Sequence, residues 1–220
     1  MGLLALLLLS AKPMKQRAVH SFSCSVTRTE NHNFAMSPTL SGFVFAGGQS
    51  TRFGSNKLFH PIGGVPMGLV VLNNVKGCLG ESSLVGPRLE HPEFVNVLQM
   101  SGDREGNGPL GAMCDVLDQA TTDFVVFAPC DTPFFMSTDF ERLIEERSDH
   151  DVVVAADNQP PHLRHWLLSC WNVEATRGHM ISAYLSGERA IHRAISGLNI
   201  YEQHFSSHVL TNVNTPSDVQ

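Results

Sequence analysis

The residues with the clearest potential for chemistry form a glycine-rich loop that follows a short apolar run. Residues 43–46 are apolar and predict a buried strand, and the loop begins immediately after them. Glycine lacks a Cβ and adopts positive φ readily, so backbone N–H groups in such a loop can close around phosphate oxygens. The loop contains Gly47, Gly48, Arg52, Gly54 and Lys57, and its two cations would neutralise phosphate charge. Because the lysine does not directly follow a glycine, the loop is not a P-loop, and an ordinary turn with surface cations is the alternative.

An aspartate follows the most apolar run of the chain. Residues 124–128 read Phe-Val-Val-Phe-Ala, and Pro129-Cys130-Asp131-Thr132-Pro133 comes next. A carboxylate there would lie at the carboxyl end of a buried strand, where α/β proteins bind their ligands. Since Mg²⁺ takes oxygen ligands and bridges to substrate phosphates, Asp131 is a candidate metal ligand. The alternative is an aspartate that only stabilises a turn. Cys130 is expected to be a small buried side chain rather than a nucleophile.

Two other segments carry weaker signals. Residues 106–111 match the dinucleotide-binding fingerprint, but polar residues 101–105 separate them from the preceding strand, which disfavours an NAD site. Asn212 and Asn214 would point the same way on an extended segment and could orient a polar ligand, or they could belong to a helix-entry turn. His162 and His165 form the closest histidine pair, and we expect a solvated basic patch there rather than a metal site.

Short apolar runs alternate with helix-like segments from residue 41 onward. Continuous runs such as residues 152–154 predict strands buried on both faces, as in a parallel sheet covered by helices. The expected strands are 42–46, 83–86, 94–99, 123–128, 151–156 and 165–171, and the expected helices are 66–77, 109–120, 137–147, 173–185 and 188–196. We therefore expect a three-layer α/β domain over residues 41–220 with a mostly parallel central sheet.

Composition narrows the class of protein. The formal net charge of −6 over 220 residues does not favour nucleic-acid binding. Five cysteines without a C-x-x-C pair indicate reduced thiols and a cytoplasmic protein. The apolar run of residues 3–9 is too short to cross a membrane. Residues 1–40 are expected to be a disordered leader or an upstream extension, with Met36 as a sensible start of translation just before the first strand. A signal peptide is the alternative.

Taken together, the motifs resemble those of the molybdenum cofactor guanylyltransferases, which are nucleotidyltransferases of Rossmann-like fold. The resemblance runs from about residue 41 to residue 220. The matching segments, in family order, are Ala46-Gly47-Gly48-x-x-x-Arg52-x-Gly54-x-x-Lys57, Gly108-Pro109-Leu110, Pro129-Cys130-Asp131-Thr132-Pro133, Leu185-Ser186-Gly187-Glu188-Arg189 and Asn212-Val213-Asn214-Thr215-Pro216. Gly111-Ala112 reverses the usual family order, and an asparagine of the family is missing near Gly86.

The resemblance implies Mg²⁺-dependent transfer of GMP from GTP to molybdopterin that carries molybdenum, with release of pyrophosphate. It implies the following contacts: Phe45, Ala46, Gly47 and Lys57 with GTP, Asp103 with the guanine, Asp131 with both Mg²⁺ and the nucleotide, Arg52 and Lys57 with the reacting phosphates, and Asn212 and Asn214 on the acceptor side. GTP, the molybdenum cofactor and molybdoenzyme-maturation proteins are the implied partners. The alternatives are a related nucleotidyltransferase that uses CTP or a sugar-phosphate acceptor, and a catalytically weak GTP-binding homologue.

Overall fold

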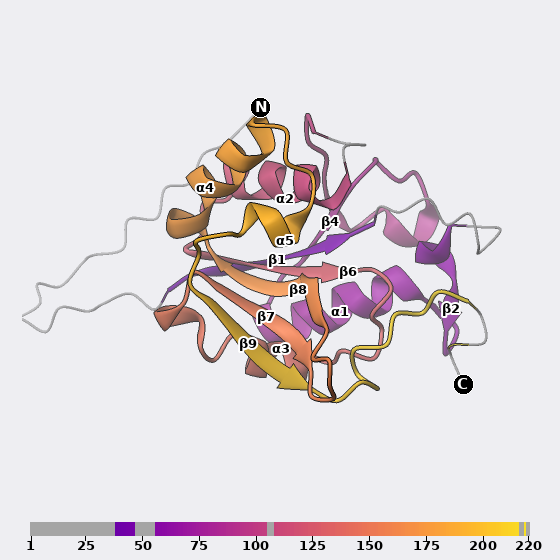
Figure 1. The fold of residues 1–220 in the computed structure, drawn as a ribbon. Coiled ribbons are helices and arrows are strands. Elements are labelled where there is room, and N and C mark those ends of the chain that lie inside the picture. The colour runs from indigo at the N-terminus through magenta and orange to yellow at the C-terminus, as the bar shows by residue number, and fades with distance from the viewer. Residues whose placement is uncertain (1–37, 47–55, 105–107, 216–217, 219–220) are drawn as a thin grey trace, which may run out of the picture. The chain divides into compact units, whose positions relative to one another are not determined.

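In the described part of the chain, seven strands form one central sheet (Figure 1). The computed structural model describes residues 38–46, 56–104, 108–215 and 218, so residues 1–37, Gly47 and Arg52 lie outside the described part. The strands are β1 (Leu40–Phe45), β4 (Ser83–Val85), β5 (Leu98–Met100), β6 (Phe124–Pro129), β7 (Val152–Asp157), β8 (Arg164–Asn172) and β9 (Ile200–Phe205). Their spatial order is β5-β4-β1-β6-β8-β7-β9.

The sheet is parallel except at β8, which confirms the expectation of a mostly parallel sheet. β8 pairs antiparallel with both β6 and β7. Its first residues therefore lie at the edge where β1 and β6 end. The pairing of β8 with β7 is interrupted, because Val154 pairs with Ser169 while Ala155 pairs with His165. Residues 166–168 thus bulge out of the ladder, a device that re-aims side chains near functional sites.

Helices cover both faces of the sheet, so the three-layer architecture is confirmed. α1 (Met67–Leu79) and α3 (Ser137–Leu143) lie on one face, and α2 (Gly108–Gln119), α4 (Val173–Leu185) and α5 (Ile191–Ala194) lie on the other (Figure 1). β6 shows why its sequence is apolar throughout. Val126 and Ala128 belong to the core beneath α1 and α3, whereas Val125 and Phe127 belong to the core beneath α2 and α4. Successive side chains on one strand thus fill two separate cores.

The largest differences from the sequence expectations lie at the sheet edges. β9 was not expected, because an edge strand is half-exposed and its sequence includes Glu202, Gln203 and His204. The expected strand 94–99 is replaced by the 3-10 helix η2 (Pro92–Phe94) and the short strand β5. A two-stranded hairpin of β2 (Pro61–Ile62) and β3 (Val65–Pro66) precedes α1. Helices α3 and α5 are shorter than the expected 137–147 and 188–196. Within the described residues, none of the helices has the length and apolar character that a membrane crossing needs.

Candidate active site

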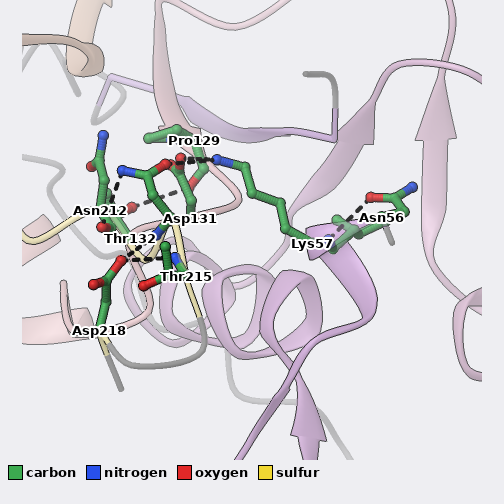
Figure 2. A network of polar contacts seen from close by, with 10 residues as sticks. Asn56, Lys57, Pro129, Asp131, Thr132, Asn212, Thr215 and Asp218 are labelled. Carbon is green, nitrogen blue, oxygen red and sulfur yellow. Dashed lines mark hydrogen bonds and ion pairs between the residues drawn. The ribbon is translucent and has the colours of Figure 1, made fainter. Parts of the chain in front are cut away.

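Lys57 is positioned by a short 3-10 helix, η1 (Lys57–Phe59), that packs against α1. Asn56 caps η1, since its Oδ1 accepts a hydrogen bond from the Leu58 N–H at 3.1 Å. Leu58 is fully buried. Gly68 permits this burial, because a Cβ at residue 68 would lie only 2.3 Å from Leu58 Cδ1. The packing anchors η1, and the Lys57 side chain extends from it toward the end of β6 (Figure 2).

Lys57 and Asp131 form an ion pair where the segments that follow β1 and β6 meet. Lys57 Nζ pairs with Asp131 Oδ2 and lies 3.4 Å from Asn214 Oδ1. The two side chains are only 18% and 11% exposed, so water screens their charges weakly. Asp131 Oδ1 is also buried and has no hydrogen-bond partner among the described residues. One carboxylate oxygen is therefore held by the lysine, and the other is available to a cation.

The segment of residues 212–215 lies against Asp131. The Val213 N–H donates a hydrogen bond to the Asp131 backbone oxygen at 2.8 Å. Asp218 Oδ2 accepts hydrogen bonds from the backbone N–H groups of Asn214 and Thr215, each at 2.8 Å, and closes the turn (Figure 2). Figure 2 shows Asn212 beside Asp131 on this segment. The structure thus brings both asparagines, from the last part of the chain, to the Lys57–Asp131 pair.

A pocket of about 360 Å³ opens beside the ion pair. Its polar side is formed by Lys57, Asp131 and Asn212, and its apolar side includes Phe45, Pro109, Trp166 and Ile191. Arg164, His165 and the bulge of β8 form a further wall of the pocket, where the sequence predicted only a solvated basic patch. A larger hollow of about 800 Å³ lies at the opposite edge of the sheet, near Asp123 and Asn172, and is remote from the Lys57–Asp131 pair.

His165 and Cys130 are the titratable groups of the pocket whose pKa is clearly displaced. Burial lowers the pKa of His165 below its ordinary value, although the carboxylates of Asp157 and Asp131 act in the opposite direction. Burial, with the nearby Asp131 charge, raises the pKa of the Cys130 thiol to about 12. The imidazole is therefore neutral at pH 7, and Cys130 stays protonated and unsuited to nucleophilic attack.

Of the other residues predicted for the site, Phe45, Ala46 and Asp103 lie at the same edge of the sheet, and Phe45 also lines the pocket. Phe45 is buried and its carbonyl accepts a hydrogen bond from the Cys130 N–H at 3.1 Å, while the Ala46 N–H donates to the Val85 oxygen at 2.8 Å. Asp103 is exposed in the turn that follows β5, and it has no hydrogen bond or ion pair with any described residue. Gly47 and Arg52 lie outside the described residues.

Comparisons with known proteins bear on the family and the fold of the chain. The family model for the MobA-like NTP transferase domain matches residues 42–200. A molybdenum cofactor guanylyltransferase of Yersinia pestis (strain Pestoides F) is 26% identical over 188 residues, which cover 83% of this chain and 94% of that protein. The crystal structure of molybdopterin-guanine dinucleotide biosynthesis protein A from Archaeoglobus fulgidus has a TM-score of 0.65 at 20% identity and covers 81% of this chain and 94% of that one. The crystal structure of 2-C-methyl-D-erythritol 4-phosphate cytidylyltransferase from Thermus thermophilus has a TM-score of 0.63 at 13% identity and covers 80% of this chain and 94% of that one. The likeness to these structures shows the Rossmann-like nucleotidyltransferase fold.

Proposed function

Because the chain belongs to the MobA-like NTP transferase domain family and is a nucleotidyltransferase, we propose that it transfers GMP from GTP to molybdopterin that carries molybdenum. The products would be pyrophosphate and the guanine dinucleotide form of the molybdenum cofactor. The observation that carries the proposal is the Lys57–Asp131 pair, which lies beside a pocket at the shared carboxyl edge of β1 and β6. The pair offers a cation to a polyphosphate and a carboxylate oxygen to a metal ion.

Asp131 is the residue that we assign as a ligand of Mg²⁺. Among the described residues, no group of three or more His, Cys, Asp or Glu side chains could hold a metal ion without help. Proteins often bind Mg²⁺ through only one or two carboxylates, with substrate phosphates as further ligands. The buried, unpartnered Oδ1 of Asp131 fits such a shared site. When bound, Mg²⁺ would stabilise the negative charge of the triphosphate and of the departing pyrophosphate.

The nucleotide would lie across the ends of β1 and β5, with Phe45, Ala46, Gly47 and Lys57 against its phosphates. Asp103, which is exposed after β5, would accept N–H groups of the guanine ring. Arg52 would add a second positive charge near the phosphates. This assignment is supported by the rule that ligands of open α/β sheets bind outside the carboxyl ends of the strands.

The acceptor would approach from the other side of Asp131, where β8 begins. The apolar side of the pocket, with Trp166 and Ile191, suits a planar pterin ring, while Asn212 and Asn214 would orient polar groups. Aromatic side chains favour stacked or edge-on contacts with such rings. The acceptor phosphate would thereby reach the Lys57–Asp131 pair from the side opposite the nucleotide.

The chemistry needs positioning and charge neutralisation more than proton transfer. The acceptor phosphate oxygen would form a bond to the α-phosphorus of GTP as the bond to the bridging oxygen breaks, and pyrophosphate would leave with that electron pair. A phosphate monoester is already ionised near neutral pH, so no strong base is required. Lys57 would neutralise charge on the phosphates during this step. The protonated Cys130 thiol agrees with a mechanism that uses no protein nucleophile.

We also propose that the reaction takes place in the cytoplasm, and that residues 41–220 form the catalytic domain after a leader or upstream extension of residues 1–40. The four described cysteines (Cys78, Cys114, Cys130 and Cys170) are free thiols, which suits a reducing compartment. Molybdoenzyme-maturation proteins would receive the product.

The test is pyrophosphate release from GTP, CTP and UTP with Mg²⁺, in the presence and absence of molybdenum-loaded molybdopterin. We expect release only with GTP and the acceptor together. Asp131→Asn should abolish it while the protein stays folded, whereas the control Asp149→Asn, at an exposed position before β7, should leave it unchanged. A preference for CTP would support a related cytidylyltransferase. GTP binding without any pyrophosphate release would support a catalytically weak homologue, and full activity of Asp131→Asn would refute the metal assignment.

A further inference from the structure

A second buried carboxylate, Asp115 on α2, lies outside the Lys57–Asp131 site and has an unusual set of contacts. Its side chain is 5% exposed. Both carboxylate oxygens are occupied by Arg104, because the Arg104 backbone N–H donates to Oδ2 at 3.0 Å and Nη1 donates to Oδ1 at 2.6 Å. Arg104 belongs to the turn after β5, so one aspartate of α2 holds this turn by both its backbone and its side chain.

The same aspartate contacts the turn at Gly102. An ideal Cβ at residue 102 would lie 2.1 Å from Asp115 Oδ2, so only glycine allows the backbone to approach the carboxylate this closely. Gly102 and Arg104 are therefore fixed on either side of Asp103. Asp103 itself is exposed and makes no hydrogen bond or ion pair with any described residue. An exposed carboxylate is thus presented from an anchored backbone.

Arg104 extends the anchorage to a second helix. Its Nη2 lies 3.5 Å from Asp118 of α2, and its guanidinium carbon lies 5.7 Å from the centre of the Tyr184 ring of α4. A buried ion pair contributes little net stability, because the free energy needed to remove both charges from water is about as large as the attraction between them. Its value here lies in fixing the turn in one orientation.

We propose that Asp115 and Arg104 act as a clasp that positions Asp103 for recognition of the nucleotide base. The inference rests on the proposed function, in which Asp103 reads guanine. Guanine presents N1–H and an amino group side by side, and one fixed carboxylate can accept both. A carboxylate on an unanchored turn would have to be ordered on binding, which lowers affinity and selectivity. Asp115 is thus a positioning residue, and it does not touch the reacting phosphates.

The test compares binding of GTP, ATP and CTP, with Mg²⁺, to the full chain and to its variants by calorimetry. Asp115→Ala should raise the dissociation constant for GTP about tenfold, the affinity equivalent of ordering one loop residue on binding. The dissociation constants for ATP and CTP should change little, so selectivity falls by a similar factor. The matched control Asp118→Ala removes an exposed acid that is farther from the same arginine and should stay within twofold of the unmodified protein. Turnover at saturating GTP should be unchanged in both variants.

A double variant gives a readout that general destabilisation would not reproduce. Arg104→Ala removes the other side chain of the clasp and should weaken GTP binding on its own. Combined with Asp115→Ala, it should add little further loss, because the side-chain pair is already broken. If Asp115→Ala does not fold, Arg104→Ala, at a less buried position, gives the same comparison.

The clasp is refuted if Asp115→Ala keeps its GTP selectivity, or if the two substitutions are additive. If the unmodified protein prefers another nucleotide and Asp115→Ala loses that preference, the clasp stands and the GTP proposal fails. If the unmodified protein shows no preference among the three nucleotides, both the clasp and the proposed use of GTP are refuted.

Discussion

Replacing Lys57 with methionine should weaken folding and catalysis together. Methionine keeps most of the length and apolar packing of the lysine but removes the ammonium group from Asp131. The Asp131 side chain is 11% exposed, so its charge would remain in a poorly solvated position without a partner. Breaking a fully buried pair costs about 3–5 kcal/mol, and we expect about 2 kcal/mol here because both groups keep some contact with water. In a domain of this size, the melting temperature should fall by about 4–8 °C.

The catalytic loss should be larger than the loss of stability. Removal of one group that stabilises charge in the transition state typically lowers turnover about 10²–10³-fold, and we expect that range for pyrophosphate release from GTP. The double variant Lys57→Met with Asp131→Asn leaves neither charge behind. It should recover most of the free energy of unfolding, while transfer stays absent.

Urea unfolding monitored by circular dichroism would give the free energies of unfolding, and a coupled pyrophosphate assay would give turnover. Lys76→Met, at an exposed position on α1, serves as the control and should match the unmodified protein in both assays. The reasoning is refuted if Lys57→Met is as stable as the unmodified protein, or if the double variant is no more stable than Lys57→Met.

Two predictions concern the wall that β8 contributes to the pocket. Trp166→Ala should raise the KM for the pterin acceptor about tenfold and leave the KM for GTP unchanged, with Trp166→Phe close to normal in steady-state kinetics; equal changes in both constants would contradict an acceptor-side role. His165 has a folded-state pKa below its ordinary value of 6.5, so the unfolded chain takes up its proton first as the pH falls. The stability that this neutral histidine contributes is complete above pH 6.5 and is lost as the pH falls through the folded-state pKa. The free energy of unfolding of His165→Gln, measured against pH, should therefore fall less steeply on the acid side than that of the unmodified protein. Parallel curves for the two proteins would contradict this role of His165.

The centre of the fold could be predicted from the sequence because its strands are buried on both faces. Residues 124–128 are apolar throughout, and the structure shows the two cores that require this pattern. In α/β proteins, ligands bind at the ends of such strands, so Lys57 and Asp131 could be predicted as site residues from their place after apolar runs. Five short motifs in a fixed order then predicted the family, which the family model confirms.

The wall formed by β8 could not be predicted, because the residues of a buried strand do not indicate the direction in which it runs. A buried strand has the same apolar character whether its neighbours run parallel or antiparallel. The reversed direction of β8 decides that Arg164 and His165 lie at the ligand edge rather than at the far side. The burial of Asp115 was equally hidden, because a lone aspartate on α2 looks solvent-exposed until Arg104 is seen folded back onto it.

The hydrogen bond between Val213 and the Asp131 backbone has a consequence for the order in which the protein is made. On the ribosome, β1, Lys57 and β6 emerge long before residues 212–214 are synthesised. Contacts between such distant parts of a chain form late, because the long intervening loop must close first. The growing chain can therefore assemble most of its sheet while the last wall of the ligand site is still missing. The complete site would then form only after synthesis has passed Asn214, so that an unfinished chain lacks the side that we assign to the acceptor.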